Sequence, residues 1–265
     1  MHSIITVTQK SLPLYPQVIC FINPKHPCHG LKIEWLKKRF KEGLVIKVLQ
    51  ASGEKGIAGF MEYVPGEYAW RGVSARDYLF IHCLWVSPNK NRRHGLGSRL
   101  IEEVVADAKA KKMRGVAVVT SDGSFMAKIE LFLENGFELI DEQEDFQLLV
   151  KRFARAGVPP SLIDARSARG KLVGWHMVYS RQCPWVARFV EEVKPIIKKA
   201  GIRVSVKELT VAKQAQQAPS LYSCFALIRD GRLLADRYIS TTRFSNILRK
   251  ETGTRGKAID SSKGA

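Results

Sequence analysis

The sequence lacks any apolar run long enough to cross a membrane. Pro13, Pro16 and scattered polar residues interrupt the first segment, so no signal peptide is visible there. Cysteine is scarce: the five residues are odd in number and irregularly spaced, which favours reduced thiols over a disulfide framework. From these absences we expect a soluble, cytoplasmic protein without a membrane partner.

Acidic residues are also few. The chain has 25 Asp and Glu against 43 Lys and Arg, which gives a formal net charge of +18. Lysine and arginine can neutralise nucleic-acid phosphates, but here they are spread along the chain. No recognition helix, zinc finger or aromatic RNA-binding motif accompanies them. We therefore do not expect a nucleic-acid partner, and attribute the charge to attraction of anionic ligands.

One short segment concentrates possible metal ligands. His26, Cys28 and His29 fall within four residues, but Pro27 interrupts them and no fourth ligand follows at the spacing of a structural zinc site. We expect no metal. The segment precedes the first long helix and could instead shape a substrate pocket, so the role of these three residues stays open.

The chain does contain a basic, glycine-bearing turn between an expected strand and an expected helix. Residues 78–86 are apolar and rich in aromatic and β-branched side chains, and residues 96–110 carry apolar residues at helical spacing. Free N–H groups at a helix start attract an anion, so the turn is predicted to hold a phosphate. The Rossmann and Walker glycine patterns are both absent. The residues expected to bind are Arg92, Arg93, His94, Gly95, Leu96, Gly97 and Ser98.

The pattern R-x-x-G-x-G, formed by Arg92, Gly95 and Gly97, resembles the acyl-CoA pyrophosphate loop of the GNAT superfamily of N-acyltransferases. The expected elements also follow the order of that family, which implies an α/β (α+β) GNAT fold. Helices are expected over 31–41 and 125–135, and strands over 44–49, 57–63, 78–86, 115–121, 137–140 and 146–153.

Such a domain should end near residue 153, so a chain of 265 residues has room for a second one. Residues 154–171 contain a Pro-Pro pair and little periodicity, as is typical of a connector. We predict a GNAT domain over 1–153, the connector over 154–171, a second domain over 172–250 and a flexible tail over 251–265.

In the second domain, strands are expected over 172–179, 202–209, 221–229 and 233–239, and helices over 186–200 and 242–250. This order resembles the thioredoxin fold, with Pro219 in the place of its cis-proline. Cys183 opens the first helix, where the dipole favours a thiolate. Val186 replaces the second cysteine of the dithiol motif, so ordinary disulfide reduction is not expected. Cys183 could be a nucleophile, a contributor to ligand capture, or a remnant of the fold.

The two domains together resemble the YoaP-like acetyltransferases over nearly the whole chain. The matching segments are 34–39, 83–86, 124–128, 131–137 and 182–185. The resemblance implies an N-acetyltransferase that uses acetyl-CoA as acyl donor. It leaves open the acceptor, a small-molecule amine or a peptide, together with the acyl chain length and the oligomeric state.

The family pattern also implies roles at the site of acyl transfer. The main chain of Leu84, Trp85 and Val86 should bind the pantetheine arm and the thioester carbonyl. Glu62 lies where several members carry the carboxylate that deprotonates the amine, and His82 is the weaker alternative base.

Phe132 stands where many members have a tyrosine that protonates the departing thiolate. Cys83, Ser121 or the acceptor itself could provide that proton instead. The missing tyrosine also leaves an alternative function open, a binding or sensor protein that responds to acyl-CoA and to thiol state through Cys183 without turnover.

Overall fold

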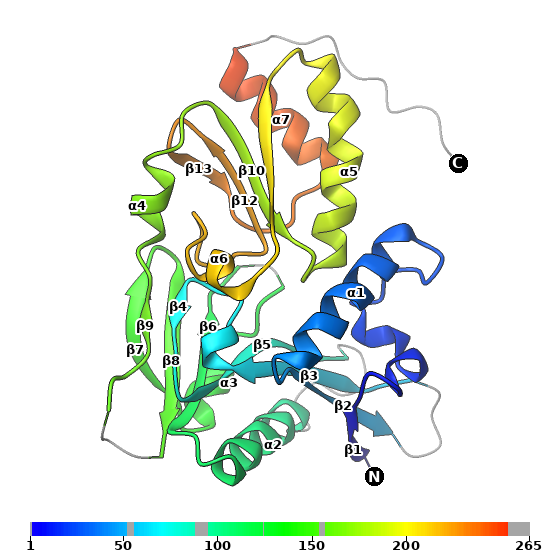
Figure 1. Cartoon of the computed structure of the whole chain (residues 1–265), viewed down its shortest axis with the longest axis vertical. Coiled ribbons are helices and arrows are strands. Elements are labelled where there is room, and N and C mark those ends of the chain that lie inside the picture. Colours follow the sequence, from blue (N-terminus) through cyan, green and yellow to red (C-terminus); the bar gives the residue numbers. More distant parts are fainter. Residues whose placement is uncertain (1, 52–55, 88–94, 124, 154–156, 254–265) are drawn as a thin grey trace.

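The computed structural model of the chain describes all residues except 1, 52–55, 88–94, 124, 154–156 and 254–265. Arg92, Arg93 and His94 of the expected phosphate turn lie outside the described residues, as does most of the expected tail. A large N-terminal sheet and a smaller C-terminal sheet follow one another along the long axis of the molecule (Figure 1). No helix among the described residues is both long and apolar enough to span a bilayer.

The N-terminal sheet has seven strands in the order β1-β2-β3-β5-β6-β8-β7, and only β5 and β6 run parallel. The strands are β1 (His2–Val7), β2 (Val45–Ala51), β3 (Gly59–Pro65), β5 (Tyr78–Val86), β6 (Gly115–Thr120), β7 (Glu138–Gln143) and β8 (Phe146–Arg152). Short 3₁₀ helices cover Leu12–Leu14, Pro16–Val18 and Gly66–Tyr68.

Helices cover both faces of this sheet. The buried side chains of α1 (Pro27–Lys41) pack with one set of strand residues, such as Val48 and Phe80. Those of α2 (Leu96–Ala110) and α3 (Ile129–Glu134) pack with the alternate set, such as Leu79 and Ile81. Alternation along a strand sends neighbouring side chains to opposite faces, so β5 contributes to two cores.

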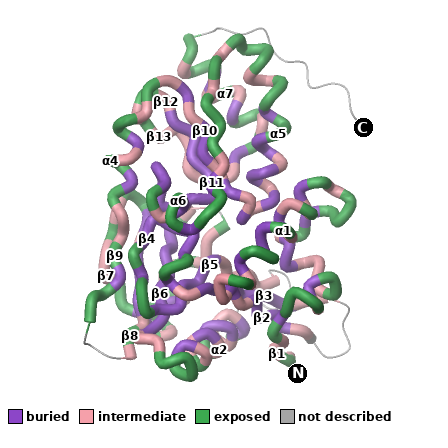
Figure 2. Tube along the Cα trace, in the orientation of Figure 1, coloured by how far each residue is buried: buried purple, intermediate pink, exposed green. Residues whose placement is uncertain are grey.

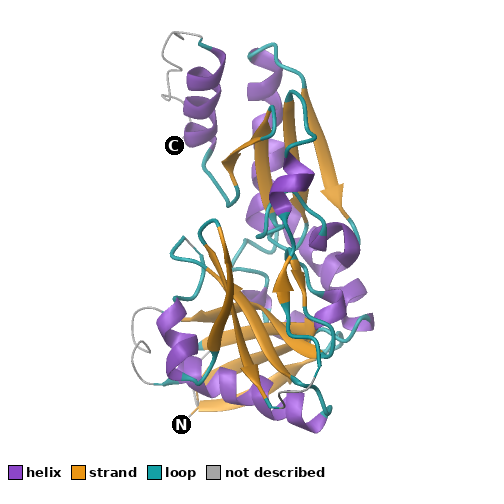
Figure 3. Ribbon diagram, turned by 90° about the vertical axis from the view of Figure 1, so that its left-hand side faces the viewer, coloured by secondary structure: helices purple, strands orange, loops and turns teal. Residues whose placement is uncertain are grey.

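The C-terminal sheet has the order β11-β10-β12-β13, with β11 parallel to β10 and the other two pairs antiparallel. Helices α5 and α7 pack on one of its faces (Figure 3). The strands are β10 (Trp175–Ser180), β11 (Val204–Leu209), β12 (Phe225–Arg229) and β13 (Arg232–Ala235). The helices are α5 (Pro184–Lys199), α6 (Ala212–Gln216) and α7 (Thr241–Thr252).

The structure differs from the expected local structure or adds to it at three places. The helix expected over 125–135 begins only at Ile129, because Phe125 has a φ of +67°, a left-handed conformation that a helix cannot include. The expected connector contains a strand, β9 (Ser161–Leu162), which pairs with β4 (Val73–Ser74), and a helix, α4 (Ala165–Arg169). No described peptide bond is cis, so the bond before Pro219 is trans.

The two sheets share one core. One buried cluster contains α1 residues together with Val178, Leu221 and Ala226 of the C-terminal part, and Figure 2 shows buried segments on both sides of the junction. The Gly72 N–H donates to the Leu221 carbonyl over 3.0 Å. A Cβ on Gly72 would lie 2.8 Å from Leu221 Cδ2 and 3.1 Å from Leu221 Cα, so the two segments leave little room for a larger residue. The C-terminal part is therefore docked by close packing.

This shared core predicts a single unfolding transition for the whole chain. Leu221 is fully buried at the junction, so Leu221→Ala should destabilise the protein by about 2–5 kcal/mol through loss of apolar burial and a residual cavity. Calorimetry combined with circular dichroism should show one transition, shifted as a unit. Two transitions, of which only one shifts, would mean that the two parts unfold independently.

Candidate functional site

Strands β5 and β6 separate part of the way along their length. Their parallel pairing extends only from Tyr78 to Ile81 of β5, opposite Gly115 to Val118 of β6. Beyond Ile81, β5 stays paired with β3 through its last residue, Val86, on its other edge. The second half of β5 therefore has main-chain groups on its β6 side that no described strand uses, and these groups are available to a ligand.

A cavity of about 780 Å³ lies at this separation. Walls from the N-terminal sheet include Leu84, Trp85 and Val86 of β5 and Val118 to Thr120 of β6. The C-terminal part adds a second wall, made of Gln182, Cys183, Trp185, Val186, Tyr222, Cys224 and Tyr238. Four of the five cysteines line the cavity: Cys20, Cys83, Cys183 and Cys224.

The described part of the expected phosphate turn has the conformation of a helix start. Gly95 is the N-cap of α2 with a φ of +70°, which glycine adopts without strain. Gly97 lies against α3, since an added Cβ would come 3.3 Å from Leu131 Cδ1. Asn135 Nδ2 donates to Ser98 Oγ over 3.0 Å, which ties the end of α3 to the first turn of α2.

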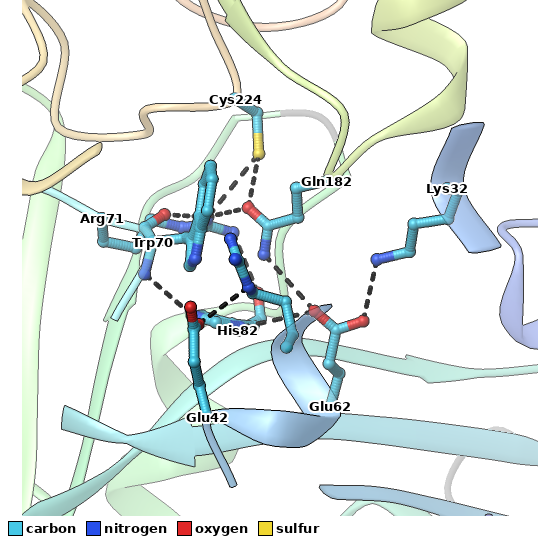
Figure 4. A network of polar contacts seen from close by, with 9 residues as sticks. Lys32, Glu42, Glu62, Trp70, Arg71, His82, Gln182 and Cys224 are labelled. Atoms are coloured by element: carbon cyan, nitrogen blue, oxygen red, sulfur yellow. Dashed lines mark hydrogen bonds and ion pairs between the residues drawn. The ribbon is translucent and has the colours of Figure 1, made fainter. Parts of the chain in front are cut away.

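Glu62 lies in the middle of β3, not at a solvated strand end, and is only 2% exposed. Its carboxylate accepts a hydrogen bond from Lys32 Nζ at 3.0 Å, and Gln182 Nε2 lies 3.5 Å from its other oxygen (Figure 4). Burial alone would raise the pKa of Glu62, but the Lys32 ammonium and the hydrogen bond with His82 outweigh it and lower the pKa to about 2. Glu62 is therefore an ionised carboxylate at neutral pH.

His82 occupies an irregularity of the ladder, because Glu62 pairs with Cys83 while Tyr63 pairs with Ile81. Its Nε2 accepts the Trp70 N–H over 2.9 Å, so the ring proton sits on Nδ1, which lies 3.4 Å from Glu62 Oε1. Burial lowers the pKa of His82 to about 4 despite the carboxylate. The ring is neutral at physiological pH.

The structure adds a candidate functional residue that the sequence patterns missed, Arg71, which is 4% exposed. Its Nη1 donates to the Trp70 carbonyl at 2.6 Å and to Gln182 Oε1 at 2.7 Å, and its Nη2 donates to the His82 carbonyl at 2.9 Å. The guanidinium lies 4.6 Å from the centre of the Tyr222 ring. Arg71 follows an apolar stretch without helical or strand periodicity, so no sequence signal marked it.

The expected thiolate at Cys183 is wrong. Cys183 is the N-cap of α5, and the N–H groups of Trp185 and Val186 favour the charged form, but burial outweighs them and raises the pKa to about 12. Burial likewise raises the pKa of Cys83 to about 12. Both side chains are neutral thiols at physiological pH.

Among the other expected residues, Phe132 lines the cavity. Phe132 is fully buried and packs edge-on against Phe137. Ser121 Oγ accepts from Arg237 Nη2 at 2.7 Å. His26 Nδ1 accepts the Cys28 N–H and caps α1. No group of three His, Cys, Asp or Glu residues suited to a metal occurs in the part of the chain that the structure describes.

The low pKa of His82 predicts acid sensitivity. The unfolded chain takes up a proton near the ordinary value of 6.5, whereas the folded protein resists protonation until about 4. The free energy of unfolding should therefore fall as the pH drops from about 6.5 to 4, by about 1.4 kcal/mol for each pKa unit of difference. Urea unfolding at several pH values measures this slope. His82→Gln should flatten it, and an unchanged slope in that variant would contradict the assignment.

Comparison with known proteins gives one family match. The model of the Acetyltransferase (GNAT) family matches residues 16–137. A curated relative, the uncharacterized N-acetyltransferase YoaP of Bacillus subtilis (strain 168), is 28% identical over 237 residues, which cover 87% of this chain and 92% of that protein.

Two solved structures show the range of similar folds. An acetyltransferase of the GNAT family from Staphylococcus aureus covers 58% of this chain and 100% of its own, with 14% identity and a TM-score of 0.44. The ribosomal-protein-S18-alanine N-acetyltransferase of Escherichia coli covers 59% of this chain and 97% of its own, with 17% identity and a TM-score of 0.42.

The match over residues 16–137 contains α1, the separating strand β5 and α2. Residues 16–137 match the model of the acetyltransferase (GNAT) family, and the chain is an N-acetyltransferase.

Proposed function

We propose that the chain transfers the acetyl group of acetyl-CoA to the amine of a small molecule held in the cavity between the two sheets. The observation that carries this proposal is the separation of β5 and β6 after Ile81, with the cavity at that point. A cavity walled by Gln182, Cys183 and Tyr222 from the C-terminal part suits an enclosed amine better than an extended peptide.

The C-terminal part, residues 172–250, is proposed to be a thioredoxin-like domain that closes the acceptor side. Its sheet order and strand directions support this assignment, as does the start of α5 directly after Cys183. Val186 stands in place of a second cysteine. The proposed contribution of this domain to the site is therefore one wall of the cavity and the buried amide of Gln182. The GNAT domain would then comprise residues 1–153.

The donor is proposed to bind along β5 and at the start of α2. The main chain of Leu84, Trp85 and Val86 faces the separation and can hydrogen-bond the pantetheine arm and the thioester carbonyl. The N–H groups of residues 95–98 open α2 and suit the pyrophosphate. Arg92, Arg93 and His94 would add charge there.

In the proposed reaction the amine nitrogen attacks the thioester carbonyl carbon, a C–N bond forms and the C–S bond breaks. The proton released by the amine goes to the departing sulfur through water, because Phe132 has no proton to give. Cys83, with a pKa of about 12, holds its proton more tightly than an ordinary thiol, which makes it a poor acid for this step. Cys83 and Cys183 are then neutral walls of the site.

Glu62 is proposed to attract and orient the amine. A carboxylate with a pKa of about 2 is ionised throughout the neutral range, so it can accept a hydrogen bond from the amine. The same low pKa makes it a weak base, since efficient bases have pKa values near the working pH. Proton removal is therefore assigned to water.

The donor assignment predicts that Gly97→Val strongly weakens CoA binding while the fold survives. The added side chain would press against Leu131 of α3 and so displace the first turn of α2, whose N–H groups are proposed to bind the pyrophosphate. Loss of the hydrogen bonds to a charged phosphate should raise the Kd for CoA by about tenfold or more, as measured by calorimetry.

Gly30→Val is the matched control, because Gly30 lies in α1 with open space around it. Unchanged CoA affinity in a folded Gly97→Val protein would overturn the donor site. Tight CoA binding by the unmodified protein, with no loss of thioester across an amine panel, would favour the sensor function instead.

The role of Glu62 predicts a specific pH dependence. Glu62→Gln should lower kcat/KM for the amine by a similar factor at every pH between about 6 and 9, because Glu62 stays ionised over this range. The shape of the profile should not change. The variant also leaves Lys32 unpaired, so an unchanged Kd for acetyl-CoA must first show that it is folded. Loss of an inflection in the profile would identify Glu62 as a base.

A further inference from the structure

Arg71 is a buried cation in the cavity wall that lacks an acidic partner. Among the described residues its acceptors are two main-chain carbonyls, the amide oxygen of Gln182 and the sulfur of Cys224. None of these acceptors is a carboxylate. Burying a guanidinium without a carboxylate is costly, so this position is stabilised if a ligand supplies the anion.

The charges lining the cavity leave a net positive site. Lys32 and Glu62 neutralise one another across 3.0 Å, and His82 is neutral because burial lowers its pKa to about 4. Among the described side chains that line the cavity, Arg71 therefore carries the one charge that no opposite charge balances. A net positive cavity favours an anionic group on the ligand, and it also favours the neutral, nucleophilic form of a nearby amine.

Arg71 keeps donors free for such a group. A guanidinium has five N–H donors, and protein oxygens take three of those of Arg71, from Nη1 and Nη2. No hydrogen bond of the described residues uses its Nε. The Tyr222 ring and Gln182 hold the guanidinium in place, so little freedom is lost when a ligand binds.

The position of Arg71 separates it from the expected phosphate site. It binds the carbonyl of His82, four residues before the end of β5, whereas the expected phosphate site is at the start of α2, beyond that end of the strand. Arg71 also contacts Gln182 and Cys224 of the C-terminal part. It therefore lies on the acceptor side of the cavity.

We infer that the acceptor is a small amine that also carries a carboxylate, which Arg71 binds while Glu62 orients the amine. This inference rests on the proposed acetyl transfer. The two oxygens of a carboxylate match the two remaining guanidinium donors in number and spacing. The substrate class is that of amino acids and related amino carboxylates.

The test compares amine acceptors that differ only in a carboxylate or a carboxamide, with rates corrected for the fraction of neutral amine. Release of CoA thiol from acetyl-CoA measures turnover by the full-length chain. The carboxylates should give kcat/KM values about tenfold or more above those of their amides, as expected for a hydrogen-bonded charge pair. Arg71→Gln should remove this preference and Arg71→Lys should retain part of it.

Gln182→Glu supplies a second, independent variant. It keeps the cation but gives Arg71 a carboxylate within the protein, so the preference for carboxylate acceptors should also disappear. Retained affinity for acetyl-CoA in each variant shows that the fold is intact. A preference that persists in folded Arg71→Gln or Gln182→Glu would overturn the inference.

The outcomes separate the inference from the function on which it rests. Equal rates with carboxylates and amides in the unmodified protein would overturn the role of Arg71 and leave acetyl transfer standing. If no amine is acetylated, the proposed acetyl transfer is refuted. Calorimetry in the presence of CoA then measures whether the protein binds amino carboxylates. Binding that Arg71→Gln removes supports the anion site, and absence of binding overturns it.

Discussion

Burial of the Glu62 carboxylate is the constraint on which the site depends. A carboxylate inside a protein is tolerated only when paired and hydrogen-bonded, and here its partners come from three regions of the chain. Lys32 comes from α1, His82 from the irregular part of β5, and Gln182 from the segment before α5. Without the C-terminal part this carboxylate would lose the Gln182 contact. The site is therefore complete only when that part is docked.

The same burial sets the acid–base properties of the cavity. Withdrawal from water raises the pKa of the Cys83 and Cys183 thiols to about 12 and lowers that of His82 to about 4, while pairing lowers that of Glu62 to about 2. None of these four groups titrates near neutral pH. The proton in acyl transfer is therefore best supplied by the substrates, and the protein contributes position and electric field.

Local pattern predicted well the two elements that are proposed to bind the donor. Strand β5 and helix α2 have the expected bounds, because an apolar run and helical spacing are strong signals over nine and fifteen residues. The acceptor side depends on pairs distant in sequence, Lys32 with Glu62 and Gln182 with Arg71, which periodicity cannot reveal. The shortened α3 depends on the positive φ of Phe125, which its apolar character did not signal. Charge distribution likewise gave no indication that Arg71 would be buried.

The segment before α5 does not give Cys183 the surroundings of a reactive cysteine. A cysteine at a helix N-terminus usually gains reactivity when solvent and N–H groups stabilise its thiolate. Here Trp185 donates to the Cys20 carbonyl and Gln182 reaches Arg71 and Glu62, so the segment is closed against the N-terminal sheet. Closure excludes the water that a thiolate requires, and the same closure places the Gln182 amide between a buried anion and a buried cation. In this turn the amide of Gln182, and not the sulfur of Cys183, contacts the buried charges Arg71 and Glu62.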